Sequence, residues 1–178
     1  MENELKNYQE NIYKHIIETL DMFPYLTCAL IPKSDYPEFV LKGLLIESDY
    51  LISNSLTIKT AQSYFKNLLL VRVVIPLDYR MTGCKIYDVN KVIDWNKLPD
   101  EHRHFNGSFD YGNLICSHLP EEVPDMDNPI LENLRTTFKL FLAYNYYIKT
   151  KQWKMEEYKH GESGKKEYEQ RRLKRKAK

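Results

Sequence analysis

Three of the chain's five histidines and one of its three cysteines lie in one short stretch, "HRHFNGSFDYGNLICSHLP", residues 102–120. They are His102, His104, Cys116 and His118. Two kinds of chemistry use these residue types: cysteine and histidine are zinc ligands, and a cysteine thiolate is a nucleophile for acyl transfer. A third interpretation is that the four are unrelated loop residues and that Cys116 packs as a small apolar side chain.

Spacing bears on the zinc interpretation. The pairs His102/His104 and Cys116/His118 each leave one residue between ligands, whereas structural zinc sites usually leave about two to four. A nucleophilic Cys116 needs help to ionise, because the thiolate attacks and the thiol does not. His118 could lower the thiol pKa or take a proton, since residues two apart in an extended chain share a face. The residues alone leave all three interpretations open.

The other cysteines predict no chemistry. Cys28 and Cys84 lie in apolar, strand-like stretches, so we expect both in the core. The three cysteines give neither a disulfide framework nor a C-x-x-C pair, which favours a reduced, cytoplasmic setting. The polar start of the chain has no signal-peptide pattern, and no apolar run is long enough to cross a bilayer.

The composition predicts one globular domain with a basic tail. The chain has 178 residues, of which 43% are hydrophobic and 29% charged. We place the domain at residues 1–164 and the tail at 165–178. The tail holds eight basic and two acidic residues, a net charge of +6 in a chain whose total is +1. Such a tail is either a solvated extension or an arm that docks on an acidic protein or a nucleic acid.

The elements that would position the loop follow from periodicity. Apolar residues at helical spacing predict a helix from Leu5 to Leu20, ended by Pro24. Extended, Leu/Ile/Val-rich stretches at 25–32, 39–48, 55–60, 68–76 and 85–89 predict an antiparallel meander. After Pro99 the pattern lapses for about thirty residues, as in a functional loop.

Order resumes at Asn128, which we expect to cap a helix with Pro129 in its first position. The apolar stripe of this helix comprises Leu131, Leu134, Phe138, Phe141 and Ile148. A glycine-containing loop then separates further helical pieces. The sequence predicts an α+β fold with helices packed against one sheet.

The segments "IPLDYRMTGCKIYDV", "HFN" and "GNLICSHLP" resemble the ubiquitin-conjugating enzyme family. His104-Phe105-Asn106 takes the place of that family's His-Pro-Asn motif, with Phe105 for the proline. Cys116 takes the place of the catalytic cysteine, and its ten-residue separation from Asn106 is two residues longer than usual. The resemblance implies the family's fold: an N-terminal helix, a four-stranded antiparallel meander, an active-site loop and C-terminal helices.

The end of the chain is similar to one branch of that family. Trp153 followed by "KHGESGKKEY", and the Cys-x-His at Cys116, resemble prokaryotic conjugating-enzyme-like proteins. Those occur in bacterial antiphage operons with cyclic-oligonucleotide signalling and act on a nucleotidyltransferase. The partners implied are the C-terminus of a ubiquitin-like protein or of a nucleotidyltransferase, and an activating-enzyme-like protein. No membrane or nucleic-acid partner is expected.

The resemblance also implies roles for the site residues. Cys116 would carry a protein C-terminus as a thioester and pass it to an amine, with no cofactor or metal. Asn106 would donate its amide N–H to the oxyanion or brace the loop, His118 would assist proton transfer, and His104 would hold the loop through its backbone. Two alternatives remain: a scaffold of the same fold with an inert Cys116, and a small zinc protein.

Overall fold

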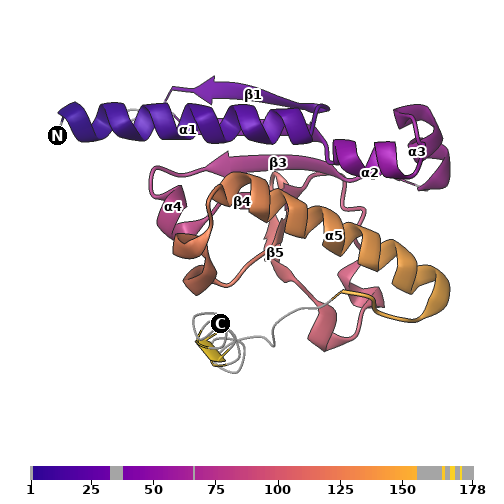
Figure 1. Cartoon of the computed structure of the whole chain (residues 1–178). Helices are drawn as coiled ribbons and strands as arrows, with labels where there is room; N and C mark the ends of the chain where they lie inside the picture. The colour runs from indigo at the N-terminus through magenta and orange to yellow at the C-terminus, as the bar shows by residue number, and fades with distance from the viewer. Residues whose placement is uncertain are drawn as a thin grey trace.

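The computed structural model describes residues 2–32, 38–65 and 67–155, together with residues 166, 169, 170 and 173; side chains are described from Asn11 onward. The predicted basic tail and the "KHGESGKKEY" segment lie almost wholly outside these residues. No helix in the described part combines the length and the apolar character needed to cross a membrane. Figure 1 shows the arrangement of the elements.

The described residues form an α+β fold. Its long helices are α1 (Glu2–Met22) and α5 (Pro129–Thr150), and α2 (Ser48–Ser53), α3 (Ile58–Tyr64) and α4 (Tyr79–Thr82) are short. The strands are β1 (Leu26–Ile31), β2 (Glu38–Leu44), β3 (Leu70–Ile75), β4 (Lys85–Asp88), β5 (Phe105–Phe109) and β6 (Gly112–Ile115). Three 3-10 helices, η1 (Trp95–Lys97), η2 (Asp100–His102) and η3 (Pro120–Asp125), complete the chain.

The six strands make one antiparallel sheet in the order β1-β2-β3-β4-β6-β5. The first four strands form the expected meander, but the sheet is larger than predicted. The stretch expected to be a long loop contains the β5–β6 hairpin, whose second strand pairs with β4. Polar residues and glycines in "FNGSF" and "GNLI" hide the alternation that would have predicted these strands.

One predicted strand is wrong. Residues 55–60 were expected to be extended, but a helix, α3, begins at Ile58. Thr57 and Thr60 bond to each other's backbone N–H groups in a capping box, at 3.2 and 2.7 Å. Ala61 is buried against the core. Capping and this contact outweigh the strand preference of the threonine- and isoleucine-containing sequence.

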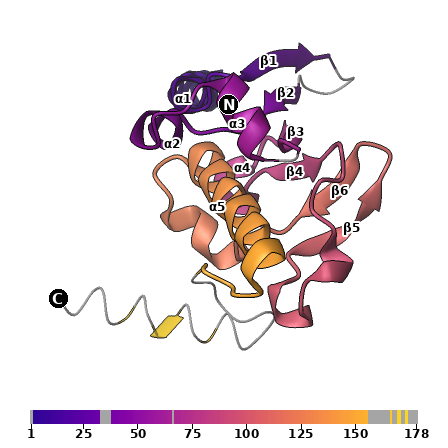
Figure 2. The same cartoon turned by 90° about the vertical axis from the view of Figure 1, so that its right-hand side faces the viewer.

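The core lies between the sheet and the two long helices, which Figure 2 shows on the same side of it. In β3, alternate residues point inward, and Val71, Val73 and Ile75 are buried. Burying each side chain of this size contributes about 1.5–3 kcal/mol. The fully buried residues include Ile12 of α1, Phe23 directly after it, and Leu134, Phe138 and Phe141 of α5.

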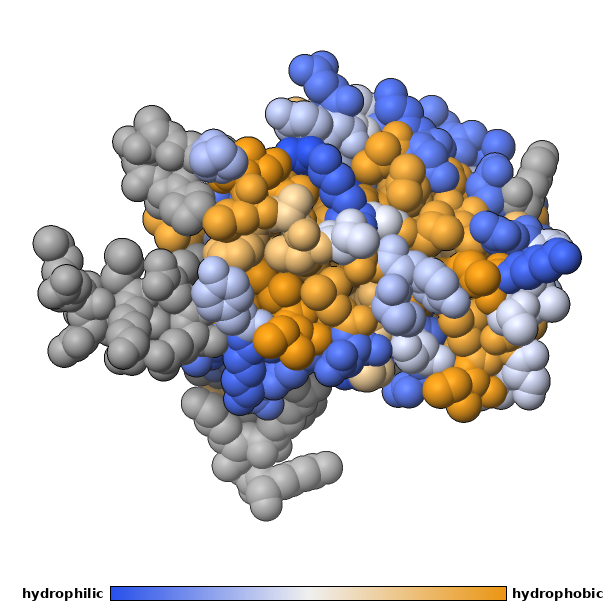
Figure 3. All heavy atoms as spheres, turned by 90° about the horizontal axis from the view of Figure 1, so that it is seen from above, coloured by the Kyte–Doolittle hydropathy of each residue, from blue (hydrophilic) through white to orange (hydrophobic). Residues whose placement is uncertain are grey.

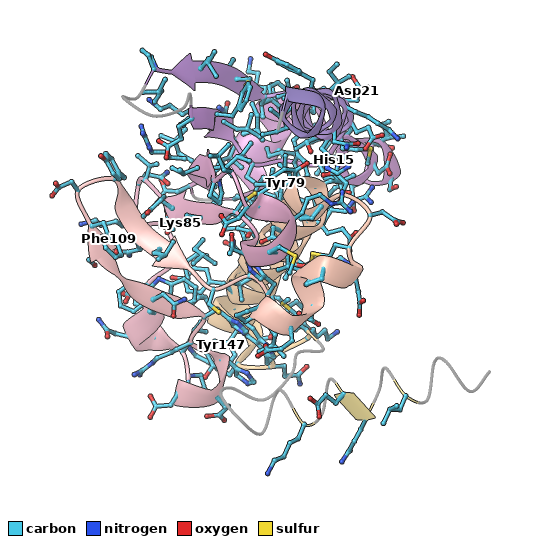
Figure 4. All side chains as sticks on the ribbon, turned by 90° about the vertical axis from the view of Figure 1, so that its left-hand side faces the viewer. His15, Asp21, Tyr79, Lys85, Phe109 and Tyr147 are labelled. Carbon is cyan, nitrogen blue, oxygen red and sulfur yellow. The ribbon has the colours of Figure 1, made fainter. Side chains whose placement is uncertain are left out.

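The start of α5 confirms the predicted cap. The Asn128 side chain accepts a hydrogen bond from the Leu131 N–H at 3.1 Å, and Pro129 is the first helical residue. The Asn128 amide also donates to the backbone carbonyl of His15 at 3.1 Å. His15 Nδ1 in turn lies 2.9 Å from the Tyr79 hydroxyl, and Figure 4 shows these two side chains pointing toward each other. This buried contact ties together α1, α4 and α5.

The edge strand β1 corrects the prediction for Cys28. We expected Cys28 in the core, but it is exposed, while Cys84 is buried as predicted. β1 pairs with β2 and lies at the edge of the sheet that the described residues form, and only Leu26 of the strand is buried. Leu30 on β1 and Ile17 on α1 are also exposed. Figure 3, which views the molecule from above, shows apolar side chains gathered on this face.

Candidate active site

The β5–β6 hairpin places Cys116 directly after the end of β6. The Cys116 N–H donates to the His104 carbonyl at 3.0 Å, which extends the hairpin pairing by one step. β6 is held between β4 and β5. Gly112 permits this close pairing, because its φ is +121° and a Cβ there would lie 2.2 Å from the Asp88 carbonyl oxygen. The backbone around Cys116 is therefore fixed on both sides.

A β-bulge lies in the strand that carries Asn106. The pairing of β5 with β6 shifts by one residue between Phe105 and Ser108, so one extra residue lies within 106–107. Bulges of this kind bend a strand and redirect its side chains. The Asn106 side chain hydrogen-bonds to the Cys116 thiol, and this bond lowers the thiol pKa. The structure thus brings the predicted nucleophile and the predicted oxyanion donor together.

Opposing effects set the pKa of the Cys116 thiol. Burial is the largest and raises the pKa, and the negative charge of Glu122 raises it further. Backbone hydrogen bonding with His118 and the side-chain bond with Asn106 act in the other direction. Sγ lies 3.6 Å from the His118 carbonyl oxygen, to which the thiol can donate. The net result is a pKa above the ordinary value, so the resting group is a protonated thiol.

The His118 ring binds to neighbouring elements. Its Nε2 lies 3.3 Å from the Thr82 carbonyl oxygen at the end of α4, and its Nδ1 lies 3.0 Å from the Ser117 hydroxyl. Burial lowers the pKa of His118, whereas bonds to Thr82 and Asn133 raise it. The ring lies against Gly83, where an added Cβ would be 2.5 Å from Nε2.

The contact shown between His118 and Cys116 therefore runs through the main chain of His118. A shared face for the Cys116 and His118 side chains requires an extended strand through both residues. β6 ends at Ile115, so strand alternation stops before the pair. His118 positions the loop through its ring and reaches the sulfur through its backbone.

A buried polar pair that the sequence did not predict lies next to the nucleophile. Ser117 and Asn133 are buried, and the Ser117 hydroxyl donates to the Asn133 Oδ1 at 3.2 Å. The bond joins the nucleophile loop to the first turns of α5. A signal was present, because Asn133 stands beside Leu134 in the predicted helix, within its mainly apolar buried face.

His104 and His102 contact groups other than the sulfur of Cys116. His104 contributes its carbonyl oxygen to Cys116, as expected for a residue that holds the loop. The His102 ring stacks on Trp153 with centroids 4.5 Å apart. Among the described residues, no three His, Cys, Asp or Glu side chains are grouped so that they could hold a metal ion.

Cys116 opens onto a cavity of about 810 Å³ that follows α5. On the nucleophile side, the lining includes His104, Ser117, Leu119 and Glu122. The rest of the lining comes from α5, from α2 and α3 through Tyr50 and Tyr64, and from the segment after α5. A half-buried thiol at the wall of such a cavity can meet a bound carbonyl, with the amide of Asn106 beside it.

The chain was compared with protein-family models, curated proteins and solved structures, and none of the three comparisons finds a match. The resemblance to conjugating enzymes therefore stays a prediction that rests on the sequence motifs.

Proposed function

We propose that this protein is a cysteine-dependent acyl transferase with a ubiquitin-conjugating-enzyme-like fold. It carries the C-terminus of a partner protein as a thioester on Cys116 and passes it to an amine. The observation that carries the proposal is the placement of the three thiols. Cys116 lines the cavity and bonds to Asn106, whereas Cys84 is buried and Cys28 is exposed on an edge strand.

The fold supports this proposal at a coarser level. α1, the meander β1–β4 and α5 follow one another in the order that the sequence resemblance implies, with α2 and α3 inserted between β2 and β3 and the β5–β6 hairpin added to the sheet. The physiological role we propose is bacterial antiviral defence, with a nucleotidyltransferase as the partner. This part rests on the Cys-x-His and C-terminal motifs of the sequence.

The proposed chemistry consists of two acyl transfers. First, the Cys116 thiolate attacks the carbonyl of a thioester on an activating partner; the new C–S bond forms, the old one breaks, and the departing thiolate takes the proton that Cys116 lost. Next, an amine attacks the Cys116 thioester. The C–N bond forms, the C–S bond breaks, and the Cys116 thiolate takes a proton from the amine. Asn106 donates its N–H to the oxyanion of each tetrahedral intermediate.

The raised pKa of Cys116 favours a second candidate, a scaffold in which this thiol is inert. A protonated thiol attacks poorly, so transfer requires that a bound partner promote ionisation. Reactivity at Cys116 distinguishes the two candidates.

The test incubates the protein with the product of its neighbouring gene or with an activating-enzyme-like partner, followed by non-reducing gels and mass analysis. Cys116→Ser should trap the partner as an ester that is stable to thiols, and Cys116→Ala should abolish the adduct. Cys28→Ala, which removes an exposed thiol outside the site, is the matched control and should load normally. Transfer that survives Cys116→Ala would leave only the scaffold.

A further inference from the structure

The cavity at Cys116 has a basic end that the proposed transfer does not explain. It follows α5 to its last turn, where Lys149 and Lys154 line it, and Lys139 lies midway along the helix. The Lys149 Nζ lies 4.6 Å from the centroid of the Tyr64 ring, and the Lys154 Nζ lies 4.4 Å from that of Tyr146. These ring contacts hold the ammonium groups without neutralising them.

The charge of these lysines is not balanced locally. None of the three forms an ion pair with any residue in the described part of the chain. The opposite charge lies at the Cys116 end, where Glu122 and Glu132 line the cavity. Backbone N–H groups hold these carboxylates in place: Leu119 donates to Glu122 at 3.0 Å, and Asp127 donates to Glu132 at 3.1 Å.

The positions of the lysines along α5 give their distances from the nucleophile. Asn133 is the point of α5 nearest in bonding to the nucleophile, because it bonds to Ser117, the neighbour of Cys116. Distances along the helix are therefore counted from Asn133. At the rise of an α-helix, Lys139 lies about 9 Å further along and Lys149 about 24 Å. Apolar lining residues, among them Leu142 and Ala143, lie between the two lysines. An extended chain rises about 3.3 Å per residue, so these distances correspond to about three and seven residues.

We propose that this cavity binds the extended C-terminal segment of the acyl donor and that the segment is acidic. Its carboxylates lie about three and about seven residues before the carbonyl that reacts with Cys116. The inference rests on the proposed function and names the chemistry of its partner. Lysines without an ion-pair partner among the described residues attract carboxylates more strongly in a partly enclosed cavity than on open surface.

A peptide fits this charge pattern better than a nucleic acid does. A nucleic-acid backbone carries a phosphate at every step and would place negative charge beside Glu122 and Glu132 as well as beside the lysines. A peptide places carboxylates only where the lysines lie, and it presents an apolar side chain to Leu142 and Ala143.

The test uses a fluorescein-labelled ten-residue peptide with glutamate at the third and seventh positions before its C-terminal glycine. A second peptide has glutamine at both positions. Binding to full-length Cys116→Ala protein is measured by fluorescence anisotropy at low salt. We expect the glutamate peptide to bind at least about tenfold more tightly, and Lys139→Glu/Lys149→Glu to remove this preference. Lys59→Glu reverses a charge on α3 outside the cavity lining and should retain it.

A second experiment exchanges the charges between the protein and the peptide. A peptide with lysine at the same two positions should bind the Lys139→Glu/Lys149→Glu protein and not the parent. Circular dichroism melting identifies any variant that fails to fold, and Lys139→Met/Lys149→Met then removes the charges without reversing them. Equal binding of the glutamate and glutamine peptides would overturn the proposal. Displacement of the glutamate peptide by a single-stranded oligonucleotide at lower concentration would overturn it in favour of nucleic acid.

Failure of this inference is distinguishable from failure of the proposed function. Adduct formation at Cys116 is measured on gels and does not depend on the labelled peptide. If Cys116 never forms an adduct but the charge-exchange experiment succeeds, the proposal that the cavity recognises acidic peptides is supported and the proposed transferase function is refuted. If Cys116 loads and the two peptides bind equally, the transferase stands and the acidic donor falls.

Discussion

Asn106 on β5 hydrogen-bonds through its side chain to the thiol of Cys116, which follows β6 directly. The bond opposes the effect of burial, which raises the thiol pKa. In the proposed transfer, the same amide would donate to the oxyanion that forms when a carbonyl carbon bonds to the sulfur. One side chain can therefore assist both ionisation and acyl transfer.

Replacing Asn106 by alanine should slow both steps. The thiol pKa should rise because a bond to sulfur is lost, so alkylation by iodoacetamide at neutral pH should be slower than in the parent. Acyl transfer from Cys116 should fall by about 10²–10³. Alkylation is measured by stopping the reaction at set times and weighing the protein by mass spectrometry. Acyl transfer is measured as single-turnover discharge of the Cys116 thioester. Asn96→Ala, at an exposed position on η1, is the control. An unchanged alkylation profile for Asn106→Ala would remove Asn106 from the site.

Replacing His118 by glutamine separates a positioning role from an acid–base role. The ring bonds to the Thr82 carbonyl and to Ser117, so its loss should lower stability. The shown contact with the sulfur is through the backbone, so the pH at which alkylation is half-maximal should stay the same. A large shift in that midpoint, at unchanged thermal stability, would contradict the structure and make the ring the group that ionises Cys116.

Two histidines, the buried His15 and the half-buried His118, should make the fold less stable in mild acid. Burial, followed by the charge of Arg80, lowers the pKa of His15, and burial also lowers that of His118. A lowered pKa means that the unfolded chain binds more protons, so the stabilisation is complete above the ordinary pKa of about 6.5 and is lost as the pH falls toward the folded-state value.

Urea unfolding at pH 7.5 and pH 5 measures this difference. The free energy of unfolding should be smaller at pH 5, and His15→Gln should reduce the dependence on pH. His102→Gln, whose ring stacks on Trp153 near the surface, is the matched control. Equal pH dependence in the parent and in His15→Gln would show that His15 is not the group responsible.

Asp88 should be essential to the turn that follows β4. It is fully buried, and its two carboxylate oxygens accept from the N–H groups of Val92 and Ile93 at 3.1 and 2.9 Å. Asparagine keeps one acceptor and turns an N–H toward the other donor, so Asp88→Asn should cost about 1–3 kcal/mol in the free energy of unfolding. Asp94→Asn, in a more exposed turn, should change it little. Chemical denaturation of both variants tests the prediction, and equal stabilities would refute it.

Local sequence determined the elements whose signals need no distant partner. The capped start of α5 at Asn128, the end of α1 before Pro24 and the four-strand meander could all be predicted, because caps, proline and period-two patterns act over a few residues. The polar β5–β6 hairpin could not, because its pairing with β4 stabilises it and its own pattern is weak. The candidate nucleophile, Cys116, and the amide of Asn106 were likewise identifiable from residue type and motif.

Only the tertiary structure decided how the site is oriented. The sequence predicted a contact of the His118 ring with Cys116, whereas the ring bonds to Thr82 and Asn133, which are distant in the chain. The apolar surroundings of Cys28 in the sequence predicted burial, but it is exposed on β1, an edge strand of the described sheet. Both outcomes depend on which elements meet in space. Burial and hydrogen bonding between distant segments are properties of packing, and short-range patterns carry no information about them.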